Sequence, residues 1–248
     1  MAGHSKWAQI KRKKGANDVK RGKIFSKLAK EIQVATKLGG GDPDLNPRLR
    51  SAILAAKAES VPAENIERAI LKGTGDLEGS NAYEELVYEG YGTDGIAILI
   101  EALTDNKNRS AAEIRSLFSK NGGSLGAPGS VAWMFERKSH YFFEKGDESK
   151  LFEVAVEAGA DDVLAGEEGS VEVVAPVEAF DKVDKALRAA GWVPDQSKLS
   201  YFPKNETELE GEAASRILKL IEQLEDHDDV QNVFSTLHLS DSLLQSLE

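Results

Sequence analysis

The sequence predicts an α+β protein of several domains, because its hydrophobic periodicity changes along the chain. From about residue 20 to residue 73, apolar residues recur every three to four positions, as in amphipathic helices. From residue 83 onward, strand-like and helix-like segments alternate, and the last strand-like segment (229–239) has no partner nearby in the sequence. We therefore expect a three-helix domain followed by two split-βαβ, ferredoxin-like α/β sandwiches, one inserted in the other.

The N-terminal part reads as three short helices. The first covers residues 20–38, with lysines roughly opposite its apolar face. Asn46 is expected to cap a second helix that begins at Pro47, and Pro62 to begin a third that ends at Gly73. The apolar face of the first helix is formed by Ile24, Phe25, Leu28, Ile32 and Ala35.

The next segment changes to the strand period. Residues 83–103 predict two strands, the second apolar enough to be buried on both faces. A helix over 106–120 follows, with Ser110 and Glu113 suited to a capping box. After it come a glycine-rich loop and a segment, residues 131–145, that we interpret as a hairpin.

The last hundred residues predict a second α/β set. A helix, a strand, a helix and a strand are expected at about 148–159, 170–175, 177–190 and 192–203, and then a helix at 207–224. The strand at the C-terminal end would complete the sheet begun by residues 83–103. The resulting domains are residues 1–79, a discontinuous domain of 80–132 with 206–248, and an inserted domain of 133–205.

Composition excludes several kinds of chemistry. The 248 residues include no cysteine, which excludes disulfides, thiolate zinc sites and cysteine nucleophiles and fits a reducing cytoplasm. The sequence shows no apolar run of about 18 residues, as a membrane span requires. The N-terminus also lacks the apolar core of about 7–15 residues that marks a signal peptide. We therefore expect a cytoplasmic protein that does not bind membranes.

Charge is strongly segregated along the chain. The formal net charge is -11, yet the first thirty residues hold ten lysines and arginines and one acid, whereas residues 80–248 hold 15 basic and 33 acidic residues. A dense basic block is typical of a segment that binds nucleic acid, and the alternative is a solvated helix face with a charged tail. We expect phosphate contacts from the block, with Trp7 either stacking on a base or folding onto the helical domain. The predicted nucleic-acid-binding residues are Lys6, Trp7, Lys11, Arg12, Lys13, Lys14, Lys20, Arg21, Lys23, Lys27 and Lys30.

Two further segments suggest sites. In TDNKNRS (104–110), Lys107, Asn108 and Arg109 lie where a buried strand meets a helix, so they could hold an anion or a partner as a secondary site. Ordinary turn and capping chemistry explains the same residues, and we favour that interpretation. The glycine loop of residues 122–130 lacks the Gly-Lys-Ser/Thr of a phosphate loop, and we interpret it as a hinge, with a partner-binding loop as the alternative.

Signals for catalysis are weak. The four histidines are scattered without ligand spacing, and no Ser-His-Asp or HExxH pattern is present. Pairs of neighbouring acids are better explained as solvated surface charge. We therefore expect no catalytic residues, no metal, no cofactor and a non-enzymatic role. The histidines are His4, His140, His227 and His238.

Several of these segments together resemble the YebC/PmpR family. They are AGHSKW (2–7), KRGKIFSKLAKEI (20–32), Asn46-Pro47, PAENI (62–66), TDNKNRS (104–110) and GGSLGAPGSVAWMF (122–135). The resemblance implies three domains, a helical one and two α/β domains, one inserted in the other. It also implies a regulatory protein, since bacterial members are described as DNA-binding transcriptional regulators.

The resemblance leaves more than one partner open. A mitochondrial relative is a translational activator of cytochrome c oxidase subunit I, and some bacterial members have been linked to the ribosome. The basic block is rich in lysine, which acts as a point charge for phosphates rather than as a bidentate reader of bases, so its chemistry favours RNA. The family description favours promoter DNA. A weaker third hypothesis is an enzyme or sensor with a cleft between the α/β domains.

Overall fold

The computed structural model describes residues 18–77, residues 82–238 and residue 240. The described chain forms two compact units. One comprises residues 28–77 and 137–201, and the other comprises residues 18–27, 82–136 and 202–238. None of the described helices combines the length and the apolar content that a membrane crossing requires.

The three expected N-terminal helices are present. They are α2 (Asp18–Gly39), α3 (Pro47–Ala58) and α4 (Ala63–Thr74). Asn46 caps α3 as predicted, its side-chain oxygen accepting a hydrogen bond from the Leu49 amide at 3.1 Å. Its Nδ2 also donates to the carbonyls of Ala35 and Gly40, both at 2.8 Å. A single buried side chain therefore sets the start of α3 and holds the end of α2.

Helix α2 is buried on all sides over residues 32–36, and not on one stripe alone. Helix α4 crosses it closely at Gly73, where an added Cβ would lie 2.5 Å from the Thr36 Cβ and 2.6 Å from the Gln33 carbonyl oxygen. The prediction that Gly73 ends the helix is wrong. The helix continues to Thr74, and Gly75 with φ +86° provides the left-handed cap, because Gly73 is needed for the close approach of two backbones.

The first sheet joins segments far apart in the sequence, in the strand order β3-β1-β2-β9. Strand β2 is buried along nearly its whole length, as expected. It pairs antiparallel with β1 on one side and with β9 on the other, so the C-terminal strand completes this sheet as predicted. The strands are β1 (Glu84–Tyr91), β2 (Ala97–Thr104), β3 (Ser124–Leu125) and β9 (Val230–Ser235).

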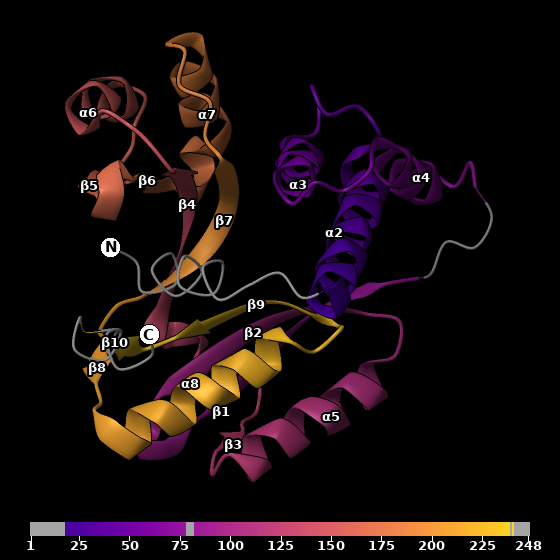
Figure 1. Cartoon of the computed structure of the whole chain (residues 1–248), viewed down its shortest axis with the longest axis vertical. Helices are drawn as coiled ribbons and strands as arrows, with labels where there is room; N and C mark the ends of the chain where they lie inside the picture. The colour runs from indigo at the N-terminus through magenta and orange to yellow at the C-terminus, as the bar shows by residue number, and fades with distance from the viewer. Residues whose placement is uncertain (1–17, 78–81, 239, 241–248) are drawn as a thin grey trace. The chain divides into compact units, whose positions relative to one another are not determined.

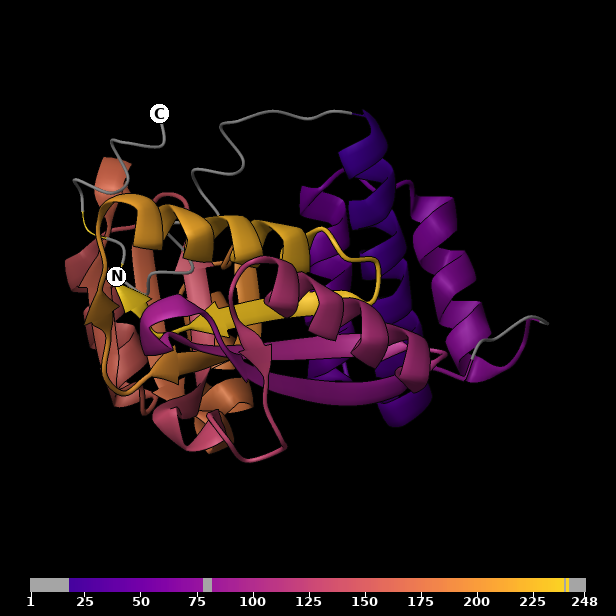
Figure 2. The same ribbon diagram turned by 90° about the horizontal axis from the view of Figure 1, so that it is seen from below.

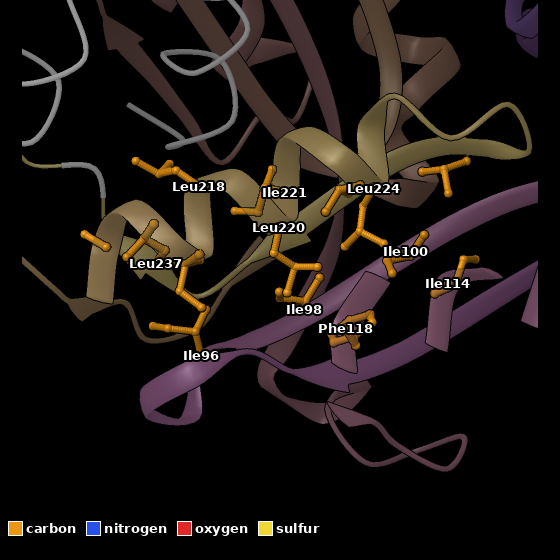
Figure 3. Close-up of a cluster of buried hydrophobic side chains, with 14 residues drawn as sticks. Ile96, Ile98, Ile100, Ile114, Phe118, Leu218, Leu220, Ile221, Leu224 and Leu237 are labelled. Atoms are coloured by element: carbon orange, nitrogen blue, oxygen red, sulfur yellow. The ribbon is translucent and has the colours of Figure 1, made fainter. Parts of the chain in front are cut away.

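One face of this sheet is covered by two helices lying side by side, α5 (Lys107–Lys120) and α8 (Gly211–Glu225), as Figure 1 and Figure 2 show. Figure 3 shows the core between the layers, where side chains of β2, α5 and α8 meet. The core includes Ile98 and Ile100 from β2, Ile114 and Phe118 from α5, and Leu220, Ile221 and Leu224 from α8.

The second sheet is built from residues 135–203, within the predicted insertion, in the order β5-β6-β4-β7. Its chain order is β-α-β-β-α-β, a split-βαβ arrangement; the sequence predicted this class of sandwich but with the order β-β-α-β-α-β. A core of Tyr141, Phe143, Leu151, Val173 and Leu187 lies between the sheet and its two helices. The elements are β4 (Phe135–Phe143), α6 (Glu148–Glu157), β5 (Asp162–Ala165), β6 (Val171–Pro176), α7 (Phe180–Ala189) and β7 (Gln196–Pro203).

Several expected elements differ in the structure. The hairpin over 131–145 is wrong: a 3-10 turn (Ala132–Met134) leads into the single strand β4, because residues 135–143 contain no turn-forming Gly, Pro or Asn and pair instead with later strands. The helix expected from residue 207 begins at Gly211, since β8 (Thr207–Glu208) pairs with β10 (Leu237–His238). Strand β5 was not expected at all.

The cap of α5 also differs from the prediction. The Ser110–Glu113 capping box is wrong, because Asn106 is the N-cap and accepts from the Arg109 amide at 3.1 Å. Ser110 is buried in the first turn, and its hydroxyl is used in another interaction, described below.

Substituting Gly73→Ala should destabilise the protein by about 1–3 kcal/mol, because the added methyl group overpacks the crossing of α4 on α2. The matched control is Gly22→Ala in α2, where an added Cβ meets nothing within 4 Å. There, alanine should stabilise the helix by about 0.5–1 kcal/mol. Urea unfolding measures both changes, and a Gly73 variant as stable as the Gly22 variant would contradict the close crossing.

Candidate nucleic-acid interface

The described part of the predicted interface is the first half of α2. Lys23, Lys27 and Lys30 lie three or four residues apart, so they follow one side of the helix. Arg21 and Lys23 are exposed, and Lys27 and Lys30 are partly exposed. The binding role of these four residues stays a prediction. Lys6, Trp7, Lys11, Arg12, Lys13 and Lys14 lie outside the described residues, and Lys20 is described only by its place in α2.

Two of these lysines contact the C-terminal end of α8, which belongs to the same compact unit as residues 18–27. Lys23 Nζ donates to the Asp226 carbonyl at 3.1 Å, and Lys27 Nζ donates to the Glu225 carbonyl. Helix α8 has no basic residue in its own last turn, so the two ammonium groups satisfy carbonyls at the negative end of its dipole. A nucleic-acid phosphate that binds Lys23 or Lys27 therefore competes with the carbonyls at the end of α8 for the same ammonium group.

The apolar side of the first half of α2 is less buried than the sequence suggested. Ile24 is 38% exposed, whereas the apolar-face prediction places it inward. Arg21, which the helical wheel places near this side, lies with its guanidinium 5.7 Å from the centre of the Phe25 ring. That stacking covers part of the ring and holds a cation at the beginning of the helix.

The TDNKNRS segment converges on one buried carboxylate from the end of the chain, Asp229. Its Oδ2 accepts hydrogen bonds from Ser110 Oγ at 2.7 Å and Thr104 Oγ1 at 3.2 Å, and pairs with Arg109 Nη2 at 2.8 Å. The Asp229 carbonyl also accepts from the Leu103 amide at 2.8 Å. The segment therefore joins the end of β2 and the start of α5 to the residue before β9.

The contacts of Arg109 with Asp229 and Asp105 reduce the charge available at the predicted secondary anion site. The side chain of Arg109 pairs with both Asp229 and Asp105, and the hydrogen bond to Asp229, followed by that to Asp105, raises its pKa above the ordinary range. Its positive charge is thus largely balanced within the protein. Lys107 and Asn108 are exposed in the first turn of α5, and a site formed by them stays a prediction.

A second buried carboxylate, Glu89 on β1, holds the glycine loop, and the sequence analysis missed it. Its oxygens accept from the backbone amides of Gly129 at 2.6 Å, Val131 at 2.7 Å and Ala132 at 2.8 Å. Its carbonyl also accepts from the Gly126 amide at 2.7 Å. Within this segment Ser124–Leu125 forms the edge strand β3, which pairs with β1, and the hinge interpretation of the loop stays a prediction. Alternation along β1 gave no signal, because Glu89 lies on the same face as the exposed Glu85 and Val87, opposite Tyr88, which packs against the core.

Ionisation of Glu89 is favoured by the loop. Burial by itself raises its pKa, but the hydrogen bonds from Gly129, Val131 and Ala132 outweigh burial, so the pKa lies below its ordinary value of 4.5. Amides that in a phosphate loop would face the ligand are here occupied by a protein carboxylate. The loop therefore does not have those amides available for a phosphate group.

The described histidines each face a glutamate. His227 Nε2 lies 2.8 Å from Glu113, and His140 Nε2 lies 3.2 Å from Glu172, a buried pair on neighbouring strands. His238 pairs with Glu206. Within the described residues, no three side chains of His, Asp or Glu are grouped so as to hold a metal ion.

Comparison of the sequence with known proteins finds the same family along the chain. A family model described as the TACO1/YebC protein N-terminal domain matches residues 5–76, and one described as the TACO1/YebC second and third domain matches residues 83–237. A relative from Syntrophus aciditrophicus, called a "Probable transcriptional regulatory protein", is 51% identical over 100% of this chain and 99% of its own. One from Desulfatibacillum aliphaticivorans with the same name is 53% identical over 98% and 99%.

A solved structure is also similar. The crystal structure of a conserved hypothetical protein from Aquifex aeolicus matches with a TM-score of 0.83 and 42% sequence identity, over 92% of this chain and 94% of that chain. The multidomain α+β fold is thus shared with an experimentally determined structure.

Substituting Asp229→Ala should destabilise the protein by about 2–4 kcal/mol, because two buried hydroxyls and Arg109 lose their shared acceptor. The neighbouring Asp228→Ala is the control, since its side chain is 73% exposed; it should change stability by no more than about 0.5 kcal/mol. Urea unfolding midpoints compare the two. Equal effects would mean that the Asp229 interactions contribute nothing specific.

Substituting Glu89→Gln should produce a pH-dependent loss of stability. Because the folded-state pKa of Glu89 is lowered, its contribution is fully present above its ordinary pKa of 4.5 and is lost as the pH falls through the folded value. The variant should be about 1–3 kcal/mol less stable near neutral pH, and the difference from wild type should shrink in acid. Exposed Glu84→Gln on the same strand is the control. A difference between wild type and Glu89→Gln that does not vary with pH would contradict the role of the ionised carboxylate.

Proposed function

The chain belongs to the TACO1/YebC family, and on that premise we propose that it is a non-enzymatic regulatory protein of the cytoplasm that acts by binding nucleic acid. The names of its relatives support a regulatory role. The binding surface in this proposal is the basic block of the first thirty residues, including the exposed side of α2 from Arg21 to Lys30.

The observation that carries the proposal is the segregation of charge. Ten basic residues and one acid occupy the first thirty positions of a chain whose formal net charge is -11. Lysines and arginines that neutralise phosphates release condensed counterions, which supplies most of the sequence-independent affinity for nucleic acid. The acidic remainder repels the same polyanion, so the long-range electrostatic attraction is concentrated at the basic end.

Promoter DNA is the partner that the relatives' names favour, because a transcriptional regulator must recognise particular DNA sequences. In that case the protein should prefer a target promoter fragment over random duplex by at least about 1000-fold. Equal affinity for both fragments would exclude specific regulation at that promoter.

Ribosomal RNA is the second candidate, and the composition of α2 favours it. Between residues 21 and 30 the charged side chains are one arginine and three lysines, and the helix carries no asparagine or exposed glutamine there; Gln33 is buried. Reading base edges in the major groove needs arginine, asparagine or glutamine in bidentate positions. A lysine-rich surface of this kind suits phosphate contacts, as in binding to folded RNA.

The ribosome candidate makes its own prediction. The full-length protein should sediment with ribosomes from lysate at physiological salt, and deleting residues 1–19 should release it, because the deletion removes half of the block's charge. Cross-linking in cells followed by sequencing of both DNA and RNA then decides between the two partners. A protein that never sediments with ribosomes contradicts the RNA candidate.

Substituting glutamine for Lys11, Arg12, Lys13 and Lys14 should flatten the salt dependence of binding. Each lost phosphate contact lowers the slope of log K against log salt by about 0.9 on duplex DNA. The matched control replaces four exposed lysines elsewhere, which changes the net charge equally but leaves the block intact. These are Lys57, Lys120, Lys145 and Lys150. An equal change of slope in both variants would mean that net charge, and not the basic block, governs binding.

A further inference from the structure

Trp133 is the most exposed aromatic side chain among the described residues. The residue is 65% exposed, although tryptophan is usually largely buried in folded proteins. It lies in the short turn Ala132–Met134, directly after the glycine loop that Glu89 holds. The basic block does not include this residue, so its exposure needs a separate explanation.

Hydrogen bonds hold the indole N–H and the backbone around Trp133. Its Nε1 donates to the Ser130 carbonyl at 3.0 Å, and the same carbonyl accepts from the Tyr91 hydroxyl at 2.9 Å. The Trp133 carbonyl accepts from Lys204 Nζ at 2.8 Å, and the Lys204 amide donates to the Met134 carbonyl at 2.9 Å. Glu89 also binds the preceding backbone amides, so the segment is already ordered in the folded protein. Binding a ligand there therefore costs little additional conformational entropy.

The same contacts restrict what the segment can bind. The amides of Gly129, Val131 and Ala132 are occupied by the Glu89 carboxylate, whose negative charge would repel an anion beneath the loop. The indole N–H is also engaged. What remains available is the flat face of the indole ring, with the exposed ammonium of Lys204 bound to the backbone of the same residue.

A flat aromatic face beside a cation matches one kind of ligand. Nucleobases stack on aromatic side chains, and their phosphates pair with nearby lysines. A protein partner would need about 800 Å² on each side, whereas one tryptophan buries about 150–250 Å². The loop that precedes the turn of Trp133 carries only small side chains: Ala127, Pro128, Gly129 and Ser130. The surface therefore suits a single ring better than a protein interface.

We propose that Trp133 is a stacking platform for an unpaired nucleobase, with Lys204 contacting the phosphate of that nucleotide. The inference rests on the proposed nucleic-acid binding and adds a second contact, in a different part of the chain from the basic block. Because base pairing hides the faces of the bases, the platform acts on single-stranded segments and not on continuous duplex.

The first experiment measures affinity with full-length protein. The probes are a 20-nucleotide oligo(dT), a 20-nucleotide oligo(U) and a blunt-ended duplex of equal length. Trp133→Ala should weaken single-strand binding by about 5- to 100-fold without changing the salt slope, and duplex binding should be unchanged. Trp133→Phe should retain most of the affinity. The control is Phe152→Ala, which removes an aromatic side chain that is 48% exposed on α6.

Two results of this experiment overturn the proposal: a Trp133→Ala variant that binds single strands as wild type does, or one that loses duplex and single-strand affinity equally. A stronger effect with oligo(U) or with oligo(dT) assigns the platform to RNA or to DNA. If Trp133→Ala has no effect while wild type still binds with a steep salt slope, the platform fails and the proposed function stands.

A second measurement observes the ring directly. The chain has three tryptophans, so 5-fluorotryptophan labelling gives a small set of fluorine NMR resonances, and Trp133→Phe identifies the one from Trp133. Oligo(U) or oligo(dT) should shift that resonance. If wild type binds neither single strands nor duplex, the proposed function fails. The platform is then tested separately by recording the Trp133 resonance with millimolar uridine and adenosine monophosphates. A shift then supports it, and an unmoved resonance overturns it.

Discussion

The pairing of β9 with β2 is the constraint on which the rest of the structure depends. Strand β2 is buried along nearly all of its length, so it cannot be an edge strand without leaving its backbone groups unpaired. The strand that covers its free side comes from the other end of the chain. In the sequence, residues 135–203 lie between β3 and α8 and form a separate sheet, and the chain then returns to complete the first sheet.

Buried carboxylates fix these long-range connections. Asp229 joins the start of β9 to Thr104 and Ser110, and Glu89 joins β1 to the loop before β4. In the other unit, Asp184 of α7 pairs with Arg188 at 2.8 Å and with Arg50 of α3 at 3.5 Å. Each acid binds groups distant from it in the sequence. Some of the acidic residues thus stabilise the fold as buried, paired carboxylates and add little to the negative electrostatic potential at the surface.

The two proposed contacts with nucleic acid differ in physical character. The basic block supplies long-range attraction that depends on salt and hardly on sequence. Stacking on the Trp133 ring is a short-range contact that depends on an exposed base, and the Lys204–phosphate contact adds only one salt-dependent interaction. Lys23 and Lys27 connect the block to the fold, since both also bind carbonyls at the end of α8. A protein with both contacts favours nucleic acid in which charged backbone and unpaired bases occur together.

The sequence by itself determined the helical and strand periods, the cap at Asn46 and the basic block, because each depends on local pattern or on charge. The return of the last strand to the first sheet followed because that strand has no partner nearby in the sequence. Only the tertiary structure decided that Gly73 serves a helix crossing, that Asn106 and not Ser110 caps α5, and that Glu89 holds the glycine loop. It also decided that Trp133 is exposed. These features depend on which distant groups lie within hydrogen-bonding or van der Waals contact, and local periodicity carries no information on that.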